Sequence, residues 1–336
     1  MQPHPTAPQL PPTTTHHEWL EQRRHGIGSS DASIIVGLSN WESPYTLWEQ
    51  KTGRAPLNPP VDRRTQELRD WGNRIEPLIL QATAEHLGTT IYKPETAYHR
   101  ENTPWCRANL DGWAPDRGRI AEWKNVSSFL AWQWDNQIPD HAEIQVHHAA
   151  LVTGSTEAII GGLIGGNRLT VHEITLNPNI LEMLFDAETK FWHHVETDTP
   201  PDIDGHVRTM ESLTKEWAHN PGAVEVDTTD AEPLWEAYHA ALEAEKEAAK
   251  AKKEAQAKLT ALMNGHEALA TGNRVWARAR PGRLNLKRLT ADNPDLVEEY
   301  TTHLPAFDTE AFKTDHPDIY STYQHISVIP TKKESL

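Results

Sequence analysis

The spacing of apolar residues along the first part of the chain predicts helices that alternate with strands. Apolar side chains recur three or four positions apart over residues 63–87, which predicts one long helix. The same spacing predicts two later helices, over residues 140–153 and roughly 178–197. Residues 16–53 are expected to be helical and rich in loops, with Ser29 or Ser30 as the cap of the second helix.

Strand-like stretches lie between these helices. Residues 89–126 contain several β-type segments, and the turn at Pro115–Gly118 predicts that the last two of them form a hairpin. Two further strands are expected in residues 155–166 and 168–176. The order of the elements predicts an α/β fold in which helices flank a sheet.

The two ends of the chain differ in composition from this region. Residues 1–15 are rich in Pro and Thr and are expected to be a flexible tail. Residues 201–229 are rich in Pro, Gly and acidic residues, as linkers are. A stretch rich in Ala, Glu and Lys then predicts a helix over about 230–264, more typical of a structural or partner-binding arm than of a DNA clamp. Short basic strands are expected after it, in a C-terminal extension that covers residues 230–336.

Composition excludes several classes of protein. Hydrophobic residues make up 37% of the 336 residues and 13 residues are Trp, which is enough apolar material for a folded core. No apolar run reaches the roughly 20 residues that cross a membrane, and the N-terminus lacks the pattern of a secretory signal. Cys106 is the only cysteine, so the chain forms no internal disulfide. These features predict a cytoplasmic protein with no membrane partner.

Three charged residues carry the main chemical signal. Asp111 precedes a turn, and Glu122 and Lys124 follow on the next predicted strand. Residues two apart on a strand face the same way, so Glu122 and Lys124 project together, and the hairpin can bring Asp111 beside them. Two carboxylates suit Mg²⁺, with Mn²⁺ as a substitute, and such a metal stabilises charge on a phosphate and activates water. Lys124 can orient that water, so the pattern predicts hydrolysis of phosphodiesters.

Non-catalytic interpretations compete with that of a phosphodiester hydrolase. The same three residues fit a surface hairpin held by salt bridges. The net charge of −16 argues against a nucleic-acid binder, although a sum over the chain hides local basic regions. Histidines on two predicted helices invite a zinc site, but their spacing matches no zinc motif, so we expect surface or supporting roles. These histidines are His141, His147, His148, His193 and His194. The stretch GGLIGGN lacks the ending of a P-loop, which argues against an ATP-driven motor.

Four segments, in order, resemble the lambda-exonuclease/YqaJ family of viral recombinases, within the PD-(D/E)XK nuclease superfamily. The segments are WLEQRRHGIGSSDASIIVGLSNWESPYTLWEQKTG, WGNRIEP, NLDGW…IAEWKN and IQVHHAALVTG. The resemblance implies a nuclease domain over residues 16–200. Its fold would be a restriction-endonuclease-like core with a central mixed β-sheet flanked by helices, followed by an extension with a long helix and small strands.

The resemblance also assigns metal and catalytic roles. Asp111, Glu122 and Glu76 would hold metal ions, and Lys124 would be the catalytic lysine. Trp123 would contribute its backbone carbonyl as a metal ligand, while its side chain lies in the core.

Further roles concern the nucleotide. Gln145 would support catalysis from the following helix. Arg24, Ser30 and Asn109 would bind the 5′ phosphate of the strand that is degraded. Two positions depart from the family pattern, because His147 replaces a frequent second glutamine and Asn109 replaces a serine.

The implied activity is that of a phage-encoded Mg²⁺-dependent exonuclease in the cytoplasm of a bacterial host. It would digest linear duplex DNA from 5′ to 3′ and leave single strands for recombination. The expected partners are double-stranded DNA ends, a RecT-like single-strand annealing protein, and further copies of the chain, with a ring as one arrangement. Two alternatives are a structure-specific or restriction-like endonuclease and a non-catalytic protein that binds DNA ends for recombination.

Overall fold

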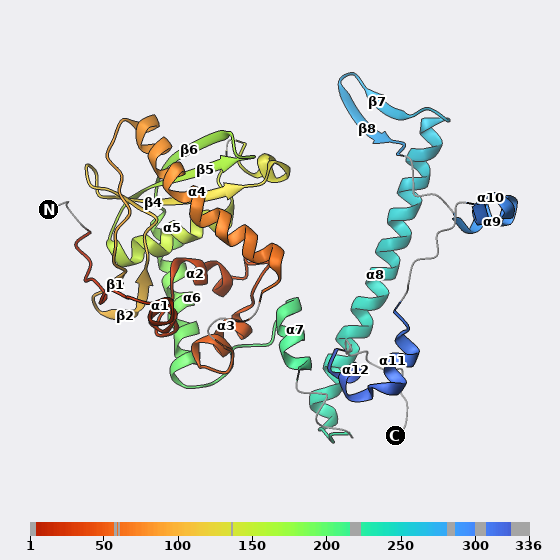
Figure 1. Cartoon of the computed structure of the whole chain (residues 1–336), viewed down its shortest axis with the longest axis horizontal. Helices are drawn as coiled ribbons and strands as arrows, with labels where there is room; N and C mark the ends of the chain where they lie inside the picture. The colour runs from red at the N-terminus through yellow and green to blue at the C-terminus, as the bar shows by residue number, and fades with distance from the viewer. Residues whose placement is uncertain are drawn as a thin grey trace. The chain divides into compact units, whose positions relative to one another are not determined.

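The chain divides into two compact units, Met1–Lys215 and Glu216–Leu336 (Figure 1). The structure, a computed structural model, describes residues 5–56, 59, 61–135, 137–215, 223–280, 286–299 and 307–323.

Four helices open the first unit, and they confirm the predicted helical start and the long helix. They are α1 (His16–Arg24), α2 (Ser29–Ile35), α3 (Pro44–Lys51) and α4 (Arg63–Leu87). The prediction that Ser29 or Ser30 caps α2 is wrong. The N-cap is Gly28, whose N–H donates to the Asp31 carboxylate at 3.0 Å, so both serines belong to the first turn of the helix.

The strands of the first unit form the mixed sheet that was predicted and, beside it, a separate pair. They are β1 (Tyr98–Arg100), β2 (Thr103–Ala108), β3 (Gly112–Ala114), β4 (Arg119–Val126), β5 (Glu157–Ile164) and β6 (Arg168–Thr175). The central sheet has the order β3-β4-β5-β6, in which β4 and β5 are parallel and the other neighbours are antiparallel. The predicted hairpin is therefore confirmed as β3–β4, and β1–β2 is a separate antiparallel pair. The strand expected around residues 89–94 is reduced to one bridge, between Tyr92 and Trp113.

Helices cover both faces of the central sheet. Helix α4 packs against β4, β5 and β6, while α5 (Asp140–Thr153) packs against β4 from the other side and also contacts β1 and β2. Helix α6 (Pro178–Glu196) and α2 pack on α5, and a short 3-10 helix, η1 (Ser128–Gln133), follows β4. Apolar residues of the strands alternate between these two layers, so Ile120 lies in the α5 core and Trp123 in the α4 core. The α/β core with flanking helices is thus confirmed.

Two glycines of β5 allow large aromatic rings to lie against the strand. A Cβ on Gly161 would come 2.7 Å from the ring of Trp123, and one on Gly162 would come 2.8 Å from the ring of Trp134. Each contact is too close for any side chain to be added without a shift. The small residues therefore fix the place of Trp123, and with it the backbone of β4.

The ends of the first unit differ from the expected tail and linker. Leu10 donates its N–H to the carbonyl of Ala97 at 2.8 Å, so part of the predicted tail runs along the chain just before β1. Helix α7 (Val207–Thr214) lies within the expected linker, and Thr209 on it donates to Ser43 at 2.7 Å. Residues up to Lys215 consequently belong to the first compact unit.

The second unit is built on one long helix, α8 (Thr228–Met263), with a hairpin of β7 (Ala268–Thr271) and β8 (Arg274–Arg278). The remaining helices are α9 (Leu286–Asp292), α10 (Pro294–Glu299), α11 (Thr309–Asp315) and α12 (Pro317–Tyr323). The predicted extension with a long helix and small strands is therefore confirmed. None of the helices in the described residues is both long and apolar enough to cross a membrane.

Candidate active site

Asp111, Glu122 and Lys124 converge beside strand β4. Lys124 donates to the Glu122 carboxylate and, at 2.6 Å, to the side-chain oxygen of Gln145 on α5. Asp111 stands at the bend between β2 and β3, and its carboxylate accepts the N–H of Trp123 at 3.2 Å. The indole of Trp123 also donates to the Asp111 carbonyl at 3.1 Å, which fixes the bend against β4.

Charge in this cluster is unbalanced. Burial and the nearby Glu122 carboxylate raise the pKa of Asp111 to about 8. Burial opposes the charged form of Lys124, but the carboxylates of Glu122 and Asp111 outweigh it and raise the pKa of that ammonium. The half-buried Asp111 and the buried Glu122 thus share the Lys124 ammonium. A divalent cation held by oxygen ligands fits this arrangement, because it would supply the missing positive charge.

Glu76 approaches the cluster from α4. Its charge contributes to the raised pKa of Asp111, but its carboxylate is paired with Lys93. Trp123 points its ring into the α4 core, so its backbone alone remains on the side of the cluster.

The acid–lysine cluster opens into a cavity of about 260 Å³. The predicted residues that line it are Asp111, Glu122, Lys124, Gln145, Ser30 and Asn109. Arg24 is not among the lining residues, whereas Arg23 is, so Arg23 is the better placed of the two to contact a phosphate in the cavity. Arg23 donates to the Ser30 hydroxyl at 2.8 Å, whereas the guanidinium of Arg24 lies against Gly53. Neighbouring helical residues point about 100° apart, which is how Arg24 comes to lie in another direction from Arg23.

Arg107 also lines the cavity, and the sequence interpretation missed it. Ile27 donates to the Trp105 carbonyl at 2.7 Å and accepts from the Arg107 N–H at 2.9 Å, which pairs the Gly-Ile-Gly segment with β2. A Cβ on Gly26 would come 2.5 Å from the Arg107 side chain, so only glycine lets that side chain cross here. The two-residue period from Asn109 back to Arg107 is the signal that could have found it.

A buried ion pair joins the Ser-Asp and Lys-Thr-Gly segments of the motif. Lys51 donates to the Asp31 carboxylate at 2.7 Å and to the Arg23 carbonyl at 2.8 Å. Burial works against the charged form of Asp31, but Lys51 and Arg23 together lower its pKa to about 2. The pair therefore anchors the end of α1 and the start of α2, which carry Arg23 and Ser30.

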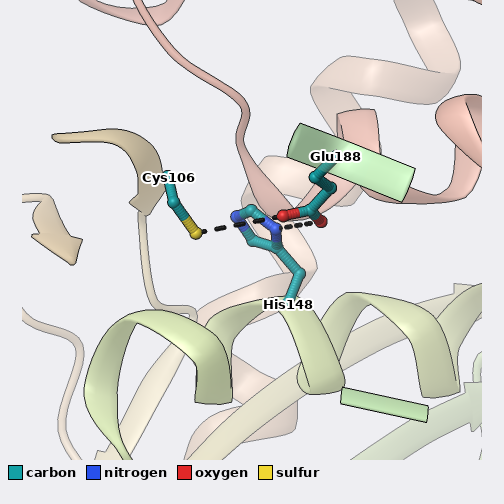
Figure 2. A group of neighbouring side chains, drawn as sticks. All are labelled: Cys106, His148 and Glu188. Carbon is teal, nitrogen blue, oxygen red and sulfur yellow. Dashed lines mark hydrogen bonds and ion pairs between the residues drawn. The ribbon is translucent and has the colours of Figure 1, made fainter. Parts of the chain in front are cut away.

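Behind the cavity wall, Cys106, His148 and Glu188 form a fully buried cluster (Figure 2). His148 shares a hydrogen bond of 2.6 Å between Nδ1 and the Glu188 carboxylate, and its Nε2 lies 2.8 Å from the Arg107 carbonyl. The Cys106 thiol donates to the other carboxylate oxygen at 3.9 Å. The cluster thereby ties β2, α5 and α6 together at Arg107.

This cluster is better described as a hydrogen-bond network than as a metal site. It offers three ligand atoms, whereas structural zinc sites use four. Each of its polar side chains already has a partner, and burial raises the pKa of the Cys106 thiol, which disfavours the thiolate that binds metal. His147 is buried too and accepts from the N–H of Asn177 at 3.1 Å, so His147 and His148 take the supporting role of the two that were expected, and not a surface position.

A mixed sheet whose strand β4, preceding bend and helix α5 bring two carboxylates, a lysine and a glutamine to a cavity with two arginines has the features of a nuclease. A model of the YqaJ-like viral recombinase domain matches residues 18–156. A Bacillus subtilis (strain 168) protein described as uncharacterized protein YqaJ is 30% identical over 300 residues, which are 86% of this chain and 92% of that protein. The chain belongs to the YqaJ-like viral recombinase family, and this membership indicates a nuclease role.

Two solved structures are more distant. The alkaline exonuclease LHK-Exo from Laribacter hongkongensis, in its complex with dAMP, is 13% identical, with a TM-score of 0.46 over 60% of this chain and 98% of that chain. A phage-related exonuclease from Haemophilus somnus 129PT is 12% identical, with a TM-score of 0.37 over 52% of this chain and 96% of that chain.

The raised pKa of Asp111 predicts how stability depends on pH in the metal-free protein. The folded state keeps the proton between pH 3.8 and about 8 while the unfolded state loses it, so stability falls as the pH rises through this window. Asp111→Asn should therefore be the more stable protein in EDTA at pH 8, by on the order of 1 kcal/mol or more. Urea unfolding measures the difference, and Asp186→Asn on the exposed side of α6 is the control. Equal stabilities for wild type and Asp111→Asn would contradict the assigned burial of charge.

The His148–Glu188 pair predicts a second pH dependence. Burial opposes the charged form of His148, but Glu188 and the Arg107 carbonyl outweigh it and raise the pKa. The stabilisation is present below the unfolded pKa, about 6.5, and is lost as the pH rises through the folded pKa. Glu188→Gln should lower the free energy of unfolding by about 3 kcal/mol near pH 6 and by less near pH 9.

Urea unfolding at both pH values measures this loss, with the exposed Glu182→Gln on the same helix as the control. A metal site would behave differently, because EDTA would then destabilise the wild type as much as the substitution does.

Proposed function

We propose that this chain is a Mg²⁺-dependent DNA exonuclease that digests linear duplex ends and leaves single strands for homologous recombination. The observation that supports the proposal best is the convergence of Asp111, Glu122, Lys124 and Gln145 on one cavity. Membership of the YqaJ-like viral recombinase family points to the same chemistry.

Asp111 and Glu122 would hold the metal, with the Trp123 carbonyl and Glu76 as further ligands. The unbalanced buried charge of the two carboxylates supports this assignment. When bound, Mg²⁺, or Mn²⁺ in its place, would supply positive charge to the scissile phosphate and lower the pKa of a water molecule. Glu76 would first have to exchange its partner Lys93 for the metal.

The other residues act on water and on the phosphate. Lys124 is held between Glu122 and Gln145, so its ammonium can orient the attacking water and stabilise charge in the transition state. Gln145 positions that ammonium by accepting one of its hydrogen bonds. Arg23 and Arg107 line the same cavity, and their guanidinium groups suit a terminal phosphate.

The direction of digestion follows from this second group. With Arg23 in place of the predicted Arg24, and with Ser30 and Asn109, the cavity would hold the 5′ phosphate and present the next phosphodiester to the acid–lysine cluster. Digestion would then run from 5′ to 3′. A phage origin, a RecT-like annealing protein and a ring of several copies belong to the same proposal, and they rest on the family resemblance.

Digestion of linear duplex DNA with Mg²⁺ or EDTA tests the proposal. Lys124→Ala should lower the rate by about 10²–10³, the usual cost of removing one preorganised donor. Lys190→Ala, on the exposed side of α6, should keep the wild-type rate. Cleavage in EDTA, or full activity of Lys124→Ala, would refute the mechanism.

A covalently closed circular duplex separates the proposed exonuclease from the two alternatives. An enzyme that needs ends leaves the circle intact, while a structure-specific or restriction-like endonuclease cuts it. A non-catalytic DNA-end-binding protein would bind linear DNA with Mg²⁺ but digest neither substrate.

The proposed contact between Arg23 and the 5′ phosphate predicts unequal effects of substitutions at Arg23 and Arg24 on the cleavage rate. Arg23→Gln should lower kcat/KM for 5′-phosphorylated duplex by about tenfold or more, the value of one hydrogen bond to a charged group. Arg24→Gln removes the same charge outside the cavity and should leave the ratio between 5′-phosphate and 5′-hydroxyl ends unchanged. Initial rates on the two kinds of end measure that ratio. If Arg24→Gln abolishes the preference for 5′-phosphate ends and Arg23→Gln does not, the assignment of the phosphate contact to Arg23 is wrong.

A further inference from the structure

Positive charge is concentrated in one part of this acidic chain. Residues 246–288 contain eleven Lys and Arg against three Asp and Glu, a net charge of +8, which leaves −24 on the rest of the chain. The change is abrupt, because residues 227–245, at the start of α8, contain six acidic residues and no Lys or Arg. The basic residues therefore mark one segment and are not spread evenly as solvating charges.

The lysines in the second half of α8 are exposed, and several have no counterion. Lys246 and Lys258 pair with glutamates on the same helix at 2.6 Å. For Lys250, Lys252 and Lys253, no carboxylate among the described residues lies within ion-pair distance, and α8 has no buried residue. Lys250 and Lys253 stand three positions apart, a spacing at which like charges on a helix repel each other.

The hairpin that follows α8 adds arginines and an aromatic ring. Arg274, Arg278 and Arg280 are exposed, and Trp276 is 50% exposed. The guanidinium of Arg274 lies 3.7 Å from the centre of the Trp276 ring, and the indole N–H donates to Thr271 at 3.2 Å. Guanidinium groups bind phosphates, and an exposed indole offers a face on which a base can stack.

Helix and hairpin form one local structure. Strands β7 and β8 both pack against α8, and the hairpin stands at the C-terminal end of that helix (Figure 1). A favourable interaction of cations with the helix dipole acts only within the last turn. It therefore explains neither Lys250–Lys253, about three turns before Met263, nor the arginines of the hairpin.

We propose that the second half of α8 and the β7–β8 hairpin form a nucleic-acid-binding surface, separate from the catalytic cavity. The eighteen residues from Lys246 to Met263 span about 27 Å at 1.5 Å per residue. That length matches about eight phosphates along one strand of duplex DNA. A segment of exposed cations with one aromatic ring suits a polyanion of any sequence, so the surface holds the DNA backbone. The identity of the ligand as DNA rests on the proposed function.

Binding of the full-length protein to a fluorescein-labelled duplex in EDTA tests this surface without cleavage. One test variant removes the arginines of the hairpin by the substitutions Arg274→Gln, Arg278→Gln and Arg280→Gln. The other removes the lysines of α8 by the substitutions Lys250→Gln, Lys252→Gln and Lys253→Gln. Each should weaken binding at least tenfold in fluorescence anisotropy. Each should also reduce the slope of log K against log salt by about 2–3, because three phosphate contacts are lost.

A charge-matched control removes three exposed cations elsewhere, Arg117, Lys190 and Lys313, also by substitution with Gln. This control variant should keep the wild-type affinity and slope. Either test variant should cleave saturating DNA at the wild-type rate. Unchanged affinity and slope in both test variants would overturn the proposal and favour an acidic protein as the partner. That result leaves the nuclease assignment intact, and a wild type that binds DNA but never cuts it would contradict the nuclease assignment alone.

Discussion

The closeness of two carboxylates, the half-buried Asp111 and the buried Glu122, to the Lys124 ammonium is the constraint on which the first unit depends. Asp111 and Glu122 are held together by the bend after β2 and by strand β4, and Lys124 donates a hydrogen bond to Glu122. Such a group is costly to bury unless more positive charge arrives. These carboxylates line a cavity, which a cation and a phosphate can both enter. The acidity of the cluster is thus a condition for its chemistry.

Two buried ion pairs hold the surroundings of this cluster in place. Lys51 and Asp31 fix the ends of α1 and α2, and His148 with Glu188 fixes the strand that carries Arg107. Neither pair touches the carboxylates of the site. The two pairs keep Arg23 and Arg107 at a constant position relative to Asp111 and Glu122, which preorganises the site for a phosphate.

The sequence predicted the elements better than their rotational details. The strand period placed Glu122 and Lys124 on one face because every second side chain of a strand points the same way. Helical periodicity located α4 and α5 for a similar reason. It could not choose between Arg23 and Arg24, because the orientation of α1 is set by hydrogen bonds from Arg23 to Ser30 and from Arg107 to the Gln22 carbonyl. The role of Arg107 was hidden for the same reason, since the contact with Gly26 joins segments far apart in the chain.

The most direct test of the metal site is an anomalous difference map from crystals soaked in Mn²⁺. We expect a peak about 2.1 Å from carboxylate oxygens of Asp111 and Glu122, and no peak beside Cys106, His148 and Glu188. A peak at the buried cluster, with none between Asp111 and Glu122, would contradict it.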